Sequence, residues 1–188
     1  MGAGGRGPSW IMVPEWRPFA LDQVVVRDML EKLGQELDAR GVTGEIVLVG
    51  GAVMLLIVGS REATRDVDAY FVANASSIRD AAAAVGEREG LPPDWINDAA
   101  KGFFYTEPPT TLWMEYPGLR VYAANADYVL AMKALAGRPE DLADMKALAK
   151  HINVTRADDV LAVVQRYVPE RFLTTRTQLL IEDLFSEG

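Results

Sequence analysis

Apolar side chains recur along the chain with helical spacing in some stretches and with strand spacing in others. The first helical stretch follows Asp22 and predicts a helix that runs to about Arg40. Asp22 is the expected N-cap of this helix, and Gly41 is its expected end. Its apolar face consists of Met29, Leu30, Leu33 and Leu37. The glycine- and proline-rich residues 1–20 before it predict an extended N-terminal segment.

Two strands with a short helix between them are predicted next. The apolar run 46–49 predicts a buried strand, Gly50 and Gly51 predict a turn, and the following apolar run predicts a short buried helix ending near Gly59. Residues 66–72 alternate, which predicts a second strand. Its two faces consist of Val67, Ala69 and Phe71 on one side and Asp66, Asp68 and Tyr70 on the other.

An alanine-rich stretch predicts a helix capped by Ser76 or Ser77 and closed near Gly90. A short helix is predicted from about Asp94, and two strands are predicted around a turn at 117–118. The rest of the pattern is helical, with helices over 126–136, from Pro139, from Thr155 to about Tyr167, and from Pro169. The order predicts an α/β (α+β) fold with a small mixed sheet flanked by helices, in which residues 21–124 form the core and residues 125–188 a C-terminal helical region packed on it.

Composition limits the classes of function. The 188 residues are 49% hydrophobic and 24% charged, as in a globular protein, and the net charge of −8 disfavours a protein that coats nucleic acid. The chain has no cysteine, which excludes thiol catalysis, and its one histidine, His151, excludes a site built on several histidines. No apolar run is long enough to cross a bilayer and no signal sequence is evident, so we expect a cytoplasmic protein without a membrane partner.

Asp66 and Asp68 suggest a cation site. Positions i and i+2 of a strand point the same way, so this pair presents two carboxylates from one face. Close carboxylates repel each other, and a hard cation with oxygen ligands, Mg²⁺ above all, relieves the repulsion. Gly50 and Gly51 carry no side chain, so phosphate oxygens can approach their backbone. Together these features predict a metal–nucleotide site, although an isolated Asp-x-Asp pair is more often a solvated strand edge.

The segment "VGGAVMLLIVGSREATRDVDAYF" resembles the signature of nucleotidyltransferases of the DNA polymerase β type, with a glycine pair, a short helix and Asp-x-Asp on the next strand. It is similar in more detail to minimal bacterial nucleotidyltransferases related to AbiEii-like and MenT-like toxins. The similarity extends through "PPDWINDAAKGFF" and "VYAANADYVLAMKALAGRPEDLADMKAL", although the stretch 52–65 is longer than in the general signature. The resemblance implies the nucleotidyltransferase fold.

The resemblance also implies further site residues. A second motif of the toxin-like relatives matches Lys133, Ala136, Arg138, Asp141 and Asp144. Lys133 lies in an apolar helix and needs a partner, either a phosphate or the aspartate pair, unless it extends to water. Asp141 and Asp144 share a helix face, and one of them could orient Lys133 or accept a proton while the other caps a helix or pairs with Arg138. Glu115 is a candidate third carboxylate.

Other residues are candidates for contacts with the nucleotide. Arg61, Thr64 and Arg65 flank the pair and could bind phosphate, or the arginines could be solvated. Asn97, Asp98 and Lys101 could contact the base or ribose, or could hold their short helix in place. His151 is expected to cap a helix C-terminus rather than to act in catalysis.

The resemblance implies transfer of a nucleoside monophosphate from an NTP to an acceptor hydroxyl, with one or two Mg²⁺ ions and release of pyrophosphate. A tRNA 3′ end is the acceptor that the toxin-like relatives favour, with a cognate antitoxin as partner. Transfer to RNA would need a basic rim, which Arg61, Arg65, Lys101, Arg120 and Arg138 could supply. The alternatives are a small-molecule adenylyltransferase of the aminoglycoside-modifying type and a nucleotide-binding or antitoxin-like protein without turnover.

Overall fold

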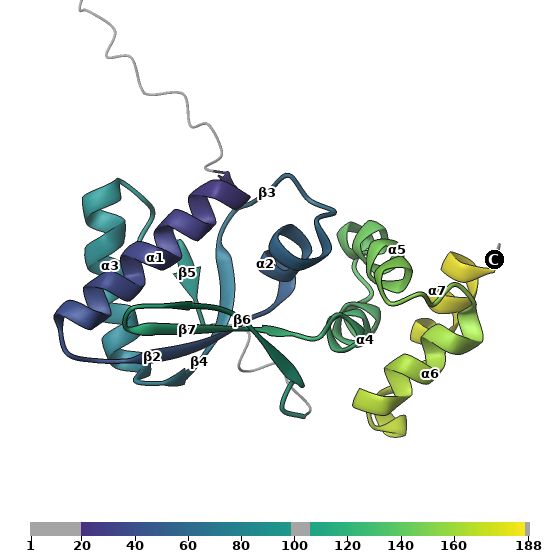
Figure 1. The fold of residues 1–188 in the computed structure, drawn as a ribbon. Coiled ribbons are helices and arrows are strands. Elements are labelled where there is room, and N and C mark those ends of the chain that lie inside the picture. The colour runs from purple at the N-terminus through teal and green to yellow at the C-terminus, as the bar shows by residue number, and fades with distance from the viewer. Residues whose placement is uncertain (1–19, 99–105, 187–188) are drawn as a thin grey trace, which may run out of the picture.

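A mixed five-stranded sheet with the strand order β5-β4-β2-β7-β6 forms the first part of the molecule (Figure 1). The computed structural model describes residues 20–98 and 106–186. β2 is antiparallel to β4 and parallel to β7, while β4 is parallel to β5 and β6 is antiparallel to β7. The strands are β2 (Gly44–Leu48), β4 (Val67–Ala73), β5 (Ile96–Asn97), β6 (Thr110–Tyr116) and β7 (Leu119–Ala124). A separate two-stranded sheet pairs β1 (Leu21–Asp22) with β3 (Ala63–Thr64).

Helices α1 (Gln23–Ala39) and α3 (Ala75–Glu89) cover one face of the large sheet (Figure 1). A Cβ placed on Gly44 of β2 would touch Leu37 of α1 and Ile78 of α3, so this strand lies directly under both helices. Ile46 and Leu48 share the face of Gly44 and pair with Phe71 and Ala69 of β4. The buried side of β4 therefore faces the helices, and Asp68 belongs to the opposite face.

The predicted first helix is confirmed. The Asp22 carboxylate accepts a hydrogen bond from the Val25 N–H at 2.8 Å, which caps α1, and all four residues of the predicted apolar face are buried. The predicted cap of α3 is wrong, because neither Ser76 nor Ser77 precedes this helix. Its N-cap position is Asn74, which has the left-handed conformation, and the Asn74 amide donates to the Thr43 carbonyl instead of capping.

The short helix after Gly50 is confirmed, with one difference. α2 (Gly50–Val53) continues as one π-helical turn, η1 (Met54–Val58), and Gly59 ends it with φ of 68°. The residues from Ala52 to Leu56 are buried, and η1 packs against α5 of the helical region.

The predicted short helix from Asp94 is wrong within the residues that the structure describes. Ile96 and Asn97 form β5, which extends the sheet beside β4, and Asn97 pairs with Asp68 in the register. The Trp95 side chain is buried under α3, where its indole N–H donates to the Ala82 carbonyl at 2.9 Å. This anchored ring holds the backbone extended where the residue pattern alone favoured a helix. Lys101 lies outside the described residues.

Four helices follow β7 and gather at one end of the sheet, beyond α2 (Figure 1). They are α4 (Ala126–Ala136), α5 (Leu142–His151), α6 (Ala157–Tyr167) and α7 (Thr175–Phe185), with short 3₁₀ turns at η3 (Pro139–Asp141) and η4 (Glu170–Phe172). The predicted starts at Thr155 and Pro169 are early, because α6 begins after Arg156 and Thr174 caps α7. Among the described residues, none of the helices has the length and apolar character of a membrane span.

Candidate nucleotidyl-transfer site

Asp66 and Asp68 lie at the start of β4, next to the end of β2. Ala69 pairs with Leu48, and the Val49 N–H donates to the Asp68 carbonyl at 3.0 Å, so the start of β4 is tied to the residues that lead into Gly50. Asp66 lies one residue before the strand, and both side chains are half-buried. Thr64 donates its hydroxyl to the Asp66 carbonyl at 3.0 Å and thereby fixes the backbone before the pair.

The two glycines approach the site so closely that no larger residue fits without a shift. A Cβ on Gly50 would lie 2.8 Å from Asp68 Oδ2, and the φ of Gly50 is 51°, in the left-handed region. A Cβ on Gly51 would lie 2.8 Å from Thr64 Oγ1 and 3.5 Å from Arg61 Nη1. The absence of side chains at this turn therefore lets one carboxylate, one hydroxyl and one guanidinium reach the same stretch of backbone.

The environment of Asp68 acts on its pKa in two opposing directions. Burial raises its pKa above the ordinary value of 3.8, and the neighbouring Asp66 carboxylate raises it further. Hydrogen bonds from the Asn97 amide and the Gly51 backbone N–H, together with the positive charge of Lys133, oppose this rise. A divalent cation between the two carboxylates would remove the repulsion that now raises the Asp68 pKa.

Asn97 lies beside this pair, whereas Asp98 turns away from it. The Asn97 amide nitrogen lies 3.0 Å from Asp66 Oδ2 and 3.5 Å from Asp68 Oδ1. Asp98 forms a 2.5 Å ion pair with Arg79 of α3. The α3 helix covers the sheet face opposite to the carboxylate pair. The side chain of Asp98 therefore lies on the other face of the sheet from Asp66 and Asp68, as expected for a residue next to Asn97.

Lys133, Asp141, Asp144 and Arg61 form one ion network between the helices and the core. Lys133 Nζ lies 2.5 Å from Asp141 Oδ1 and 2.8 Å from Asp144 Oδ2, and the side chains of the two aspartates are only 10% and 6% exposed. The Arg61 guanidinium donates to both oxygens of Asp144, at 3.0 and 2.5 Å. Asp144 thus pairs with Arg61 and Lys133, whereas Arg138 is exposed. Arg61 Nη1 would lie 3.5 Å from a Cβ on Gly51, next to Gly50 and Asp68, so the network borders the carboxylate pair.

The structure does not bring Glu115 and Arg120 to the pair. The Arg120 side chain lies 2.8 Å from Glu45 and 3.3 Å from Glu115. In the parallel register of β2 and β7, Glu45 pairs with Arg120 at the end of these strands opposite to Gly50. The prediction of Arg120 in a basic rim around the site is therefore wrong, and Glu115 does not join Asp66 and Asp68. Arg65 is exposed next to Asp66.

One candidate was missed by sequence reasoning. Tyr70 follows Asp68 by two residues on β4 and is half-buried, so it shares the face of the carboxylate pair. The alternating pattern of β4 was the signal that could have identified Tyr70 as a candidate. The same spacing places Tyr70 on the face of the two aspartates.

The donor set suits a magnesium ion with a nucleotide. Mg²⁺ prefers oxygen ligands, and it is usually bound by one or two carboxylates together with substrate phosphates and water. Asp66 and Asp68 supply two such carboxylates, and the Gly50 backbone lies directly against Asp68 Oδ2, where a Cβ would be only 2.8 Å away. In the described part of the chain, no group of three or more His, Asp or Glu side chains is arranged to hold a metal.

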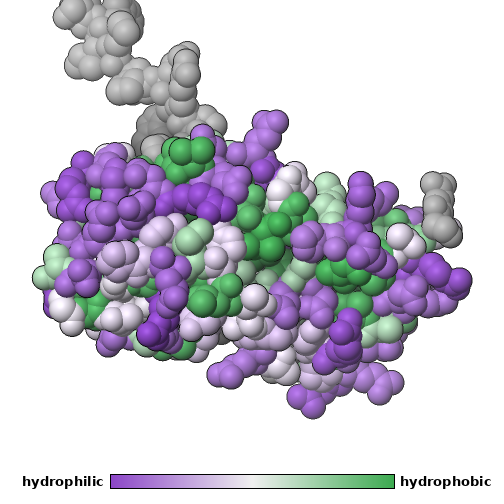
Figure 2. All heavy atoms as spheres, viewed as in Figure 1, coloured by the Kyte–Doolittle hydropathy of each residue, from purple (hydrophilic) through white to green (hydrophobic). Residues whose placement is uncertain are grey.

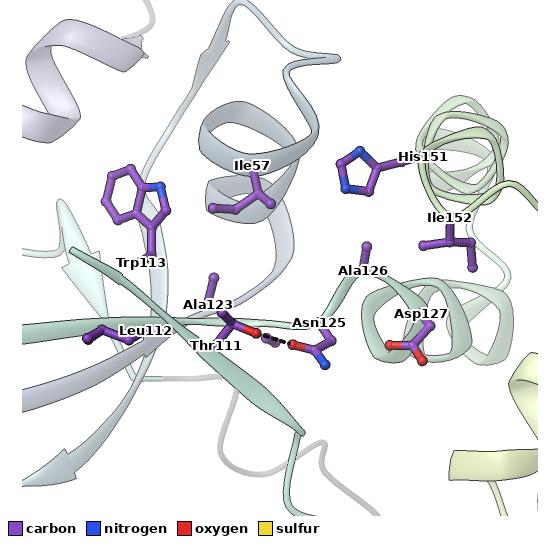
Figure 3. A pocket seen from close by; sticks show the side chains of 11 residues that line it. Ile57, Thr111, Leu112, Trp113, Ala123, Asn125, Ala126, Asp127, His151 and Ile152 are labelled. Carbon is purple, nitrogen blue, oxygen red and sulfur yellow. Dashed lines mark hydrogen bonds between the residues drawn. The ribbon is translucent and has the colours of Figure 1, made fainter.

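A hollow of about 490 Å³ lies elsewhere, between the sheet and the helical region. Ile57, Trp113 and His151 line it from η1, β6 and the end of α5 (Figure 3). Thr111 donates to Asn125 Oδ1 at 3.1 Å on its other side. It opens to Asp127 at the start of α4 and to His151 at the end of α5, whereas Lys133 and Asp144 belong to the opposite ends of these helices. It is therefore distinct from the ion network.

Figure 2 shows an apolar area in the middle of the face of the molecule that is in view, at the position of α2 in Figure 1. His151 is exposed on the last turn of α5, where its side chain contributes to the wall of the hollow.

The comparisons with known proteins agree with the geometry. Residues 26–168 match the model of a family described as nucleotidyltransferase of unknown function (DUF6036). No curated protein and no solved structure matches the chain. The match spans the glycine turn, the carboxylate pair and the ion network. The chain therefore belongs to this family of nucleotidyltransferases, whose cellular function is unknown.

Proposed function

We propose that the protein is a magnesium-dependent nucleotidyltransferase that moves a nucleoside monophosphate from an NTP to an acceptor hydroxyl. The observation that supports it most is the meeting of Asp66 and Asp68 with the Gly50–Gly51 turn at one end of the sheet, where Gly50 has no room for a side chain. The family match supports nucleotidyl transfer in general.

In the proposed reaction, the acceptor oxygen forms a bond to the α-phosphorus of the NTP. The bond between this phosphorus and the α–β bridging oxygen breaks, pyrophosphate leaves with the bonding electrons, and the acceptor proton passes to a base. A magnesium ion held by Asp66 and Asp68 would supply positive charge for the phosphate oxygens. Catalysis of this kind depends on positioning and electrostatics, so it needs neither a thiol nor a histidine.

The chain's own residues have separate roles in this proposal. Gly50 and Gly51 have no side chains that would shield their backbone, and we expect the triphosphate to approach this turn. Arg61 is 34% exposed and is held by Asp144 through two of its nitrogens, while its third nitrogen, Nη1, lies near Gly51. It is therefore the cation of the network that we expect to bind phosphate. Lys133 is 12% exposed and sits between two carboxylates, so we expect it to act mainly through its charge on Asp68.

The acceptor is open to a direct test. A tRNA 3′ end, a toxin role and a cognate antitoxin rest on the sequence resemblance, and the pairing of Arg120 with two glutamates weakens the argument for a basic rim. We would incubate the protein with each labelled NTP and Mg²⁺, together with total tRNA, with aminoglycosides, or alone.

Labelled RNA that disappears with Asp66→Ala would support transfer to tRNA. A labelled aminoglycoside would identify the small-molecule adenylyltransferase, and labelled protein would indicate self-modification. NTP binding without label on any acceptor would favour the nucleotide-binding protein without turnover. As a matched control, Asp158→Ala replaces an exposed aspartate of α6 and is expected to transfer like the wild type.

A further inference from the structure

Asn97 occupies the sheet position next to the carboxylate pair. β5 runs parallel to β4, and the register pairs Asn97 with Asp68. Paired residues on neighbouring strands point to the same face, so the amide belongs to the face of the carboxylates. The sequence had suggested contacts of Asn97 with a base or ribose, but the strand directs this side chain to the aspartates.

The contacts of Asn97 select one oxygen of each carboxylate. The amide nitrogen donates to Asp66 Oδ2 at 3.0 Å and makes a longer contact with Asp68 Oδ1 at 3.5 Å. A primary amide carries two N–H donors, so it can serve both carboxylates together. The other oxygen of Asp68, Oδ2, is the one that faces Gly50. The amide therefore fixes how Asp68 is rotated relative to the glycine turn.

A neutral donor suits this position better than a charged one. Another carboxylate would add to the repulsion that already raises the pKa of Asp68, and a lysine or arginine would compete with a metal ion for the pair. An amide brings the two carboxylates together and leaves both negative charges available to a divalent cation. Its hydrogen bonds to charged acceptors are also stronger than bonds between neutral groups.

We propose that Asn97 is the positioning residue of the carboxylate pair, and that its amide holds Asp66 and Asp68 side by side in the orientation that receives a divalent cation. This inference rests on the proposed function of the pair as a cation site, and it assigns to Asn97 a role in metal affinity instead of base recognition. Groups that orient metal-binding carboxylates typically change metal affinity by about 10–100-fold when they are removed.

The test is a titration of the protein with Mn²⁺ alone. The electron paramagnetic resonance signal of free Mn²⁺ is measured at each step. Asn97→Ala is expected to raise the dissociation constant by about 10–100-fold. Asn125→Ala is the matched control, because Asn125 is also half-buried and hydrogen-bonded, to Thr111, but lines the separate hollow. It is expected to stay within about twofold of the wild type, since removing it touches no group that orients the carboxylates. An unchanged Mn²⁺ affinity in Asn97→Ala would overturn the inference.

Asn97→Asp gives a second reading, because it keeps the size and shape of the side chain. It replaces the amide donor with a third carboxylate at the pair, so without metal we expect a lower melting temperature than in the wild type. A melting temperature in EDTA equal to that of the wild type would count against the positioning role. Asp66→Asn is measured alongside to show that the Mn²⁺ site is this pair.

The two proposals fail in different ways. If the wild type binds Mn²⁺ through Asp66 and loses affinity with Asn97→Ala, yet transfers no nucleotide to any acceptor, the proposed function fails and the inference stands. If Mn²⁺ does not bind at Asp66, both fail. If Asn97→Ala weakens only the affinity for NTP, Asn97 is instead a contact of the base or ribose.

Discussion

At the level of single residues, the backbone of the glycine turn lies in close contact with the charged side chains of the site. Gly50 and Asp68 lie so near each other that a single methyl group at residue 50 would displace the carboxylate. Burial and the Asp66 charge raise the pKa of Asp68, whereas Asn97, the Gly51 N–H and the Lys133 charge lower it. The consequences of changing one atom group here can therefore be predicted separately for stability and for metal binding.

Gly50→Ala should impair Mn²⁺ binding at the pair, because its Cβ would lie 2.8 Å from Asp68 Oδ2. Gly59→Ala is the matched control, since Gly59 also has a positive φ of 68° and nothing lies within 4 Å of its added Cβ. Both variants should lose about 1–2 kcal/mol of unfolding free energy from the left-handed backbone. Chemical denaturation and Mn²⁺ titration measure the two effects. Equal Mn²⁺ affinities in the two variants would contradict the close approach.

The raised pKa of Asp68 predicts a pH-dependent stability in the absence of metal. The folded carboxyl releases its proton at a higher pH than the unfolded one, so ionisation above the ordinary value of 3.8 favours the unfolded chain. Stability from this group therefore rises as the pH falls through the raised pKa. Asp68→Asn should be more stable than the wild type at pH 7 in EDTA, and its advantage should shrink toward pH 4. Thermal melts against pH measure this, and a constant or absent difference would argue against the assigned cause.

The elements of the fold differ in how well the sequence predicts them. α1 and β4 could be predicted because their apolar spacing and caps agree with their burial, as Asp22 and the Val67–Ala69–Phe71 face show. β5 could not, because a two-residue strand has no period of its own and depends on its pairing with β4. Sequence reasoning named most of the side chains near the pair, but it could not place Asn97 opposite Asp68 or Arg120 at the far end of β7, because strand register decides both.

A tyrosine pair lies in the contact between α4 and α6. The Tyr167 hydroxyl donates to Asp127 Oδ2 at 2.6 Å, and its ring meets that of Tyr128 edge to face with centroids 5.3 Å apart. Burial, the hydrogen bond and the Asp127 charge raise the pKa of Tyr167 to about 12. This contact joins the start of α4 to the end of α6.

Tyr167→Phe should lower the unfolding free energy by about 1.5–3 kcal/mol, because a hydrogen bond to a charged acceptor is lost. Tyr122→Phe, at a half-buried tyrosine of β7, serves as the control with a small expected effect. The wild type should also lose stability above pH 10, since the unfolded tyrosine ionises there while folded Tyr167 remains neutral. Urea denaturation at pH 7 and pH 11 tests both, and a Tyr167→Phe protein as stable as the control variant would be inconsistent with this role.

At the scale of the whole molecule, the ion network joins the sheet core to the helical region at the edge of the site. Arg61 comes from the loop after η1, Lys133 from α4 and Asp144 from α5, so three segments meet at one carboxylate. The buried position of Asp144 makes this link sensitive, because without it Arg61 would lose its carboxylate partner and Lys133 would keep only Asp141.

Asp144→Ala should cost about 1.5–3 kcal/mol of unfolding free energy, the range for losing hydrogen bonds to a charged acceptor, because Arg61 is 34% exposed and Lys133 keeps Asp141. Asp158→Ala is the matched control, because the Asp158 side chain is 87% exposed in its pair with Arg156. Its expected cost is below about 1 kcal/mol. Guanidinium denaturation measures both. A similar small loss in the two variants would mean that the network does not hold the two parts together.

The most direct measurement of the central claim is calorimetric binding of each NTP, with and without Mg²⁺, to the wild type, Asp66→Asn, Asp68→Asn and Asp158→Asn. We predict that at least one NTP binds the wild type and Asp158→Asn about tenfold or more tightly with Mg²⁺ than in EDTA, since the cation bridges carboxylates and phosphates. The Asp66 and Asp68 variants should lose this difference. NTP affinity that is the same in EDTA and Mg²⁺, or unchanged in both site variants, would contradict the account.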